Sequence, residues 1–152
     1  MTSHALLASF GIYGGTFAVA AISSVLPFVA IDVFLVGIAL VAPVAALPFV
    51  VMLAAAGQVA GKLPIYFASL GIAALPGPHR ARLDRVRRWL ARWEHAPRSV
   101  LLASAVLGLP PFSLVATAAG VLGIGPRPFA ALVFVGRGLR FAVIVAIASA
   151  AG

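Results

Sequence analysis

The absence of charge over long stretches constrains this sequence more than any other feature. Uncharged runs cover most of the chain: Ala5–Ile31, Val33–Gly61, Leu63–Pro78 and Ser99–Pro126. The longer runs exceed the roughly 20 residues that a helix needs to cross a hydrocarbon core of about 30 Å. Of the 152 residues, 63% are apolar and 9% are charged, whereas soluble domains carry roughly a quarter charged residues. We therefore expect an integral membrane protein.

Backbone chemistry selects helices for these runs. Unpaired N–H and C=O groups in lipid cost several kcal/mol each, so only helices and closed barrels span membranes. A barrel would show segments of about 10 residues that alternate apolar and polar side chains, and no such alternation is present. The sequence predicts an all-α integral membrane protein with a single membrane domain, 1–152. No Lys or Arg precedes the first apolar run, which is therefore expected to belong to the mature protein rather than to a signal peptide.

The one hydrophilic segment, 76–98, holds seven of the eleven basic residues. Its apolar residues recur at helical spacing and predict an amphipathic helix on the membrane surface: Leu83, Val86, Leu90 and Trp93. The positive-inside rule places the segment on the cytoplasmic side of the cell (plasma or inner) membrane. It acts either as a topology-setting loop or as a contact for anionic lipid headgroups along Arg80–Arg92. Its charges are too concentrated for a nucleic-acid-binding face, so no nucleic acid is expected.

The basic segment separates two apolar halves, 5–75 and 99–152, which look related. A constant offset of 83 pairs Leu26 with Leu109, Pro27 with Pro110, Gly37 with Gly120, and Pro43 with Pro126. The predicted structural breaks are Pro27, Gly37, Pro110, Pro111 and Gly120. Paired breaks in corresponding positions are typical of inverted-repeat transporters.

Each half is predicted to hold a broken, re-entrant helical hairpin followed by a transmembrane helix. In the first half, two short helices over 9–42 meet near 26–31, and a span follows over 46–75. In the second half, the broken run covers 99–124 and the span covers 129–150.

Few charges remain outside the basic segment, and one of them, Arg127, lies between two prolines in an expected loop. The other four are candidate transport or substrate-binding residues: Asp32, Lys62, Arg137 and Arg140. A charge within an apolar helix costs about 2.5–3.5 kcal/mol and by default indicates function. Asp32 is expected to cap the half-helix after the first break. Arg137 and Arg140 share a helical face, and two guanidinium groups suit phosphate or carboxylate.

Structural interpretations of these charges stay open. Asp32 could form a buried ion pair with Arg137 or Arg140. The two arginines, and Lys62, could also extend along the helix to the membrane interface. The histidines are terminal or in the basic segment and there is no cysteine, so neither a metal nor a cofactor is expected. The sequence contains no nucleophile–base pair and no phosphate loop, so we do not expect an enzyme.

Four elements, in order along residues 20–145, resemble the DedA family, also called the VTT or SNARE-associated domain family. Ser23–Asp32 resembles its opening proline-then-acid element, and Ala56–Tyr66 its glycine-rich stretch ending in tyrosine. Leu109–Gly120 resembles its second re-entrant element. Gly136–Phe141 is similar to the closing element of the shorter YqaA-like branch.

The resemblance implies two re-entrant hairpins facing each other, and movement of phospholipids or polyprenyl phosphates between leaflets in support of membrane homeostasis. By match, Asp32 takes the place of the family's first acidic residue and Arg140 that of its closing arginine. The chain departs from the family at Lys62, where many members have an acid, and over Val106–Ser113, which lacks a typical arginine pair. Phosphate would then be held by Arg137, Arg140 or Lys62.

Two other functions compete with lipid transport. One is a small-solute exporter of the small multidrug type, and the other is a holin-like accessory protein that transports nothing. Lipid transport predicts a polar groove open to the bilayer at Asp32 and Arg140. Export predicts a cavity open to water, and the accessory role predicts an ion pair in packed protein. Membrane lipids are the expected partners, and a homodimer is compatible with this length without being required by any residue pattern.

Overall fold

The regular structure in the described part of the chain is helical. We analysed a computed structural model, which describes residues 3–25, 31–74, 76–78, 80–81, 84–85, 88, 97–107 and 112–152. Its helices are α1 (Ser3–Val25), α2 (Ile31–Val41), η1 (Val44–Ala46), α3 (Leu47–Ala74), α5 (Pro97–Leu107), α6 (Phe112–Val121) and α7 (Pro126–Ala151).

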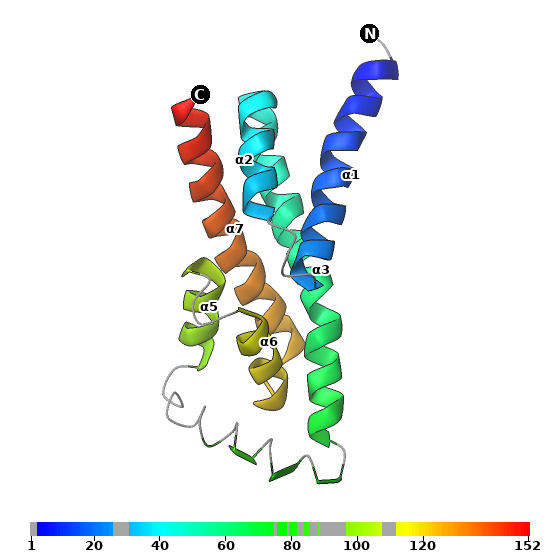
Figure 1. The fold of residues 1–152 in the computed structure, drawn as a ribbon, viewed down its shortest axis with the longest axis vertical. Coiled ribbons are helices and arrows are strands. Elements are labelled where there is room, and N and C mark those ends of the chain that lie inside the picture. Colours follow the sequence, from blue (N-terminus) through cyan, green and yellow to red (C-terminus); the bar gives the residue numbers. More distant parts are fainter. Residues whose placement is uncertain are drawn as a thin grey trace.

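The direction of the helices defines two groups (Figure 1). α1 descends from the N-terminus at the top to near mid-height, α2 returns to the top, and α3 runs the full length to the bottom. α5 then rises from the bottom to near mid-height, α6 returns to the bottom, and α7 runs to the C-terminus at the top. Both termini therefore lie at the same end.

Within the described residues, three helices are long and apolar enough to cross a membrane, with candidate spans over Ala8–Val25, Val44–Ile72 and Pro126–Ala151. At 1.5 Å per residue, α3 and α7 are about 42 and 39 Å long, whereas α2, α5 and α6 reach only about 15–17 Å. The prediction of two short helices in the first broken run is wrong for α1, which has 23 residues. The apolar run simply continues toward the N-terminus without a residue that stops a helix.

The packing partners form two matching sets. α1 packs on α3 as α5 packs on α7, α2 packs on α7 as α6 packs on α3, and the two long helices pack on each other. The buried apolar residues likewise form two clusters. An upper core joins α1, α2 and the adjacent parts of α3 and α7 around Leu35, Val50 and Phe141. A lower core joins α5, α6 and the other parts of the long helices around Leu101 and Phe129.

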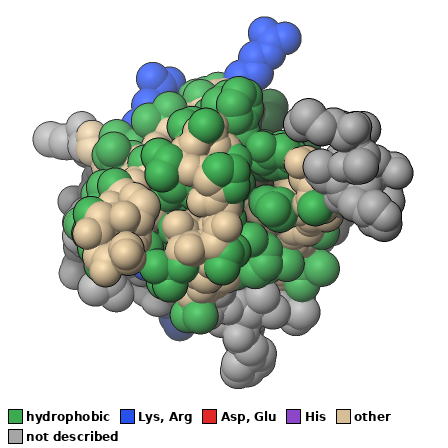
Figure 2. Space-filling view, turned by 90° about the horizontal axis from the view of Figure 1, so that it is seen from above, with side chains coloured by type: hydrophobic (Ala, Val, Ile, Leu, Met, Phe, Trp, Pro, Cys, Tyr) green, Lys and Arg blue, Asp and Glu red, His purple; other side chains and the backbone are tan. Residues whose placement is uncertain are grey.

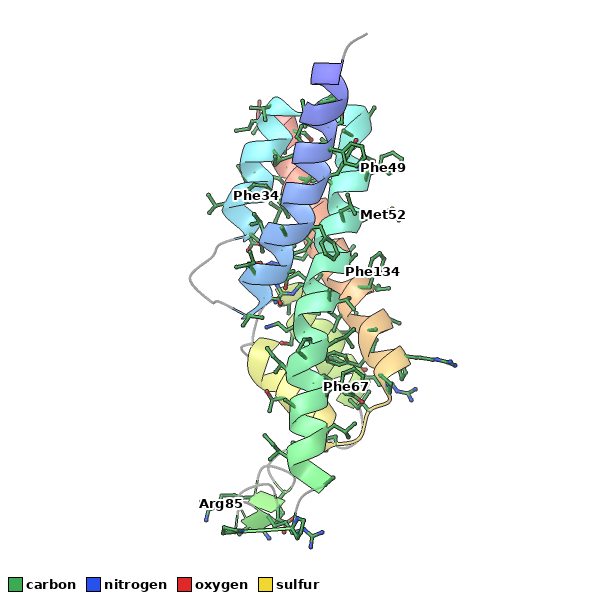
Figure 3. The ribbon with its side chains drawn as sticks, turned by 90° about the vertical axis from the view of Figure 1, so that its right-hand side faces the viewer. Phe34, Phe49, Met52, Phe67, Arg85 and Phe134 are labelled. Atoms are coloured by element: carbon green, nitrogen blue, oxygen red, sulfur yellow. The ribbon has the colours of Figure 1, made fainter. Side chains whose placement is uncertain are left out.

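The outer surface is apolar, as lipid requires. Phe49, Met52, Phe67 and Phe134 are exposed on α3 and α7 (Figure 3). The top end, where the termini lie, presents hydrophobic side chains and backbone, with Lys or Arg only at the margin of the view (Figure 2). The bottom end carries Arg85 beyond α3 (Figure 3).

The described residues of the basic segment agree in part with a surface helix. Arg80, Ala81, Asp84, Arg85 and Arg88 are helical and exposed. The apolar positions that define the amphipathic pattern, and Arg82, Arg87 and Arg92, lie outside the described residues. The amphipathic helix therefore stays a prediction.

In both halves the first helix ends, and the second begins, near a predicted break. α1 ends at Val25 and α2 begins at Ile31, and α5 ends at Leu107 and α6 begins at Phe112. Pro27, Pro110 and Pro111 fall in these intervals, outside the described residues.

The predicted breaks at Gly37 and Gly120 are wrong, because both glycines lie inside helices, α2 and α6. α6 instead ends through Gly123, which has a φ of 71°. Around it, the Ile124 N–H donates to the Ala119 carbonyl and the Gly123 N–H to the Gly120 carbonyl, the pattern of a Schellman motif. Arg127 also differs from expectation, since it lies in the first turn of α7 rather than in a loop.

Candidate functional site

Asp32 and Arg140, 108 residues apart in sequence, form an ion pair. Asp32 lies in the first turn of α2 and Arg140 in the middle of α7, and Arg140 Nη2 donates to Asp32 Oδ2 at 2.6 Å. Asp32 is the second residue of α2, where the positive end of the helix dipole stabilises its carboxylate. It is not the N-cap residue that we predicted. The side chains stay 38% and 27% exposed. The pair is therefore not enclosed in packed protein.

Arg140 also contacts the end of α5. Its Nη1 donates to the Val106 and Leu107 carbonyls, each at 3.2 Å. These bonds fix the guanidinium at the middle of the bundle, so the alternative in which Arg140 extends to the interface is wrong. One side chain thus connects α2, α5 and α7.

Lys62 is buried in the middle of α3, with 3% of its surface exposed, and its Nζ donates to the Ser24 carbonyl at the end of α1. The alternative in which Lys62 extends to the interface is therefore wrong as well. Gln58, one turn earlier and 2% exposed, donates through Nε2 to the Ala20 carbonyl and to Ser23 Oγ, both at 2.8 Å. Sequence reasoning missed Gln58, although an amide one turn from a charge in an apolar run was the available signal.

Arg137 lies with Asp32, Lys62 and Arg140 near the middle of the bundle, and these four residues form what we call the charged layer. Arg137 lies one turn before Arg140 on α7, within electrostatic range of Lys62, Arg140 and Asp32. At 1.5 Å per residue, Lys62 is about 23 and 18 Å from the two ends of α3, and Arg140 about 21 and 17 Å from those of α7. On both long helices, the charged residues lie between the upper core and the lower core.

The charges in this layer do not balance. Lys62, Arg137 and Arg140 carry three positive charges against the one negative charge of Asp32, a formal excess of two. At the ion pair, Asp32 Oδ1 and Arg140 Nε are buried and have no hydrogen-bond partner among the described residues. The excess positive charge therefore favours an anion. Of the two atoms, only Arg140 Nε is a donor, whereas Asp32 Oδ1, a carboxylate oxygen, accepts hydrogen bonds and offers none to an anion.

Glycines bring the helices around this layer into close contact. A Cβ on Gly57 would lie 2.6 Å from the Phe17 carbonyl of α1, and a Cβ on Gly136 would lie 2.5 Å from Ala105 Cβ of α5. A Cβ on Gly120 would lie 2.7 Å from the Tyr66 carbonyl of α3, whereas one on Gly37 would meet nothing within 4 Å. Gly120 is thus a packing residue, and Gly37 is not.

Two hollows lie elsewhere on the surface. One, of about 490 Å³, lies between α3 and α7 beside Ala60, Leu63 and Phe134, and the other, of about 460 Å³, lies beside Tyr13 and Phe49. Neither is lined by a charged residue. Among the residues that the structure describes, no group of three His, Cys, Asp or Glu side chains could hold a metal ion.

Comparison with known proteins adds no relative: no protein-family model, no curated protein and no solved structure matches this chain. The resemblance to the DedA family therefore stays a prediction from the residues quoted above.

Proposed function

We propose that the protein moves a lipid with a phosphate headgroup, either a phospholipid or a polyprenyl phosphate, between the two leaflets of the cell membrane. In this proposal α1–α2 and α5–α6 are two re-entrant hairpins of an inverted repeat, and α3 and α7 are the spans that follow them. The DedA-like order of sequence elements agrees with this assignment.

The arrangement of the helices supports the inverted repeat. Exchanging α1, α2 and α3 for α5, α6 and α7 leaves the set of packing partners described above unchanged. The first group begins and the second group ends at the top (Figure 1). Transporters built from inverted repeats place their substrate site near the bilayer midplane, at the interface between the repeats.

The single observation that carries the proposal is the convergence of Asp32, Lys62, Arg137 and Arg140 at that depth, with the ion pair partly exposed. Charges at the centre of a membrane are costly and mark substrate or ion pathways. An accessory protein would be expected to enclose its ion pair, which this chain does not do.

The charges indicate an anionic substrate. We assign headgroup binding to Arg137 and Arg140, because guanidinium groups bind phosphate through paired charge-assisted hydrogen bonds. Asp32 would occupy Arg140 in the absence of substrate and release it when phosphate binds. Lys62 adds to the positive potential of the layer.

The basic residues support an orientation. Arg80, Arg85, Arg88, Arg98 and Arg127 are exposed, and they belong to the segment and helix ends at the bottom. The positive-inside rule then places the bottom in the cytoplasm and both termini on the opposite side.

A liposome assay tests the proposal. Purified protein is reconstituted with a fluorescent phospholipid or with a fluorescent polyprenyl phosphate, and arrival in the outer leaflet is followed by quenching. We expect Arg140→Ala to slow movement about tenfold or more, because it removes a charge-assisted hydrogen bond to the phosphate worth about 1.5–3 kcal/mol. Asp32→Asn should also slow movement, because the carboxylate would no longer displace phosphate from Arg140. Arg127→Ala, which removes an exposed charge at the helix end, is the matched control and should leave the rate unchanged.

The outcomes separate the competing functions. Parent protein that moves neither lipid but releases a trapped cationic dye would favour the exporter. Parent protein that moves neither lipid nor dye would favour the accessory role. Lipid movement that survives both substitutions would refute the site.

A further inference from the structure

The carboxyl ends of α1 and α5 terminate inside the bundle, near mid-height, rather than at its ends (Figure 1). The last four carbonyl groups of any helix have no donor within the helix. Lipid offers no donor either, and each unpaired group there costs several kcal/mol. Both helix ends therefore need donors from elsewhere in the protein.

Both ends receive a donor from a basic side chain. The Nζ of Lys62 donates to the carbonyl of Ser24, the residue before the last of α1. The Nη1 of Arg140 donates to the carbonyls of Val106 and Leu107, the last two residues of α5, at 3.2 Å. Beyond the hydrogen bond, a positive charge is favoured at the negative end of the helix dipole.

The two contacts correspond in position. In each half the donor lies in the middle of the long helix, and the acceptor lies at the end of the first helix of that same half. A glycine four or five residues before each basic residue, Gly136 or Gly57, allows the close contact of the two helices. The acceptors Ser24 and Leu107 are separated by the offset of 83, whereas the donors Lys62 and Arg140 are separated by 78.

We infer that Lys62 and Arg140 perform the same task in the two halves, which is to fix the carboxyl end of the first helix at mid-depth. Arg140 has Asp32 as a second partner, whereas Val115, at the corresponding offset from Asp32, is apolar. Lys62 is then a positioning residue for the site and not a headgroup ligand. Its meaning for transport rests on the proposed function, but its effect on the end of α1 does not.

Single cysteines can report on the two helix ends, because the chain has no cysteine of its own. Val25→Cys and Leu107→Cys replace the last residues of α1 and α5, whose side chains are 57% and 68% exposed. Both variants are reconstituted in liposomes and treated with a water-soluble maleimide. Alkylation requires water at the thiol, so its rate reports how often each helix end leaves its place in the membrane.

We expect Lys62→Met to speed alkylation of Val25→Cys about tenfold, because a charge-assisted hydrogen bond to a buried carbonyl shifts a local opening equilibrium by at least that factor. Alkylation of Leu107→Cys should not change in this variant. Arg140→Met should produce the converse pattern. Lys62→Arg keeps the donor and the charge, so alkylation of Val25→Cys should stay slow in this variant.

Two further variants make the test decisive. Asp32→Asn removes the ion pair and leaves the hydrogen bonds from Arg140 to the carbonyls, so alkylation of Leu107→Cys should stay slow. An alkylation rate as high as in Arg140→Met would overturn the inference. If Lys62→Met does not fold, Lys62→Gln, which keeps an N–H donor without the charge, should give a smaller acceleration. An unchanged alkylation rate of Val25→Cys in Lys62→Met and Lys62→Gln, or equal acceleration at both helix ends, would also overturn it.

The labelling does not depend on transport. Protein that moves no lipid and shows the expected labelling would refute the proposed function alone. Protein that moves lipid and fails the labelling test would refute the positioning role alone.

Discussion

Gly57→Ala is the most direct test of how α1 is held against α3. The added Cβ would lie 2.6 Å from the Phe17 carbonyl oxygen, 2.8 Å from Ala20 Cβ and 3.2 Å from the Ala21 nitrogen. All three atoms belong to, or are fixed directly by, the backbone of α1. No side-chain rotation can therefore relieve the contact.

The expected cost follows from these distances. Real Cβ contacts essentially never fall below 3.0 Å, so the Phe17 carbonyl must retreat by at least 0.4 Å, the difference between 3.0 and 2.6 Å. Overpacking of this kind costs about 1–3 kcal/mol. The retreat also moves the end of α1, and with it the Ser24 carbonyl that Lys62 binds.

Gly14→Ala is the matched control, because Gly14 lies in α1 and a Cβ there meets nothing within 4 Å. Both substitutions gain the same helix propensity of about 0.5–1 kcal/mol. The difference between the two variants therefore isolates the packing cost, and we expect Gly57→Ala to be less stable than Gly14→Ala by about 1–3 kcal/mol.

Unfolding by SDS in mild-detergent micelles, followed by far-UV circular dichroism, measures the two free energies of unfolding. Adding Ala20→Gly to Gly57→Ala should recover part of the loss, as expected for residues in contact. If Gly57→Ala proves as stable as Gly14→Ala, then α1 does not approach α3 as closely as described, and the argument fails.

Three further predictions address other parts of the fold. Tyr66→Phe removes the hydroxyl that donates to the Ile124 carbonyl and should cost about 1–3 kcal/mol of unfolding free energy; a change within experimental error would show that this bond contributes nothing. Gly123→Ala forces a Cβ onto a backbone with a φ of 71° and should cost about 1 kcal/mol or more in the same assay, whereas a gain in stability would contradict the Schellman end of α6. In intact cells, an impermeant maleimide should label Ala151→Cys and not Ser99→Cys, because the positive-inside rule predicts that the basic end lies inside; the reverse labelling would invert the orientation.

The long helices could be predicted from sequence because each is a long apolar run that begins or ends near a proline or glycine: Pro43 and Pro76 flank the first, and Gly125 precedes the second. The predicted spans 46–75 and 129–150 correspond to α3 (Leu47–Ala74) and α7 (Pro126–Ala151). α1 was predicted too short, since an apolar run without a stop signal does not show where its helix begins.

The charged residues could be selected from sequence, but their roles could not. One acid among several bases in apolar runs indicated an ion pair, and Asp32 does pair with Arg140. The sequence around Lys62 is the same whether its side chain extends to the membrane interface or is buried among the helices. The deciding factor is the end of α1, 38 residues away in sequence, where the Ser24 carbonyl accepts a hydrogen bond from Lys62 Nζ.

The glycines show the same limit. Gly37 and Gly120 occupy corresponding positions in the predicted repeat, yet only Gly120 faces a neighbouring backbone closely. Whether a glycine allows close helix packing depends on the helix that faces it, and the sequence near the glycine does not identify that helix.

The sequence separation of the ion pair has a consequence for biosynthesis. At roughly 5–20 residues per second, the ribosome synthesises the 108 residues between Asp32 and Arg140 in about 5–20 s. Lys62 follows Ser24 by only 38 residues, so α1 and α3 can associate while most of the second half is still unmade. During that interval the carboxylate of Asp32 has no arginine from α7 to pair with. Until α7 has been synthesised, α2 is in contact with water or the insertion machinery instead. Its docking against α7 is therefore a late step in assembly of the bundle.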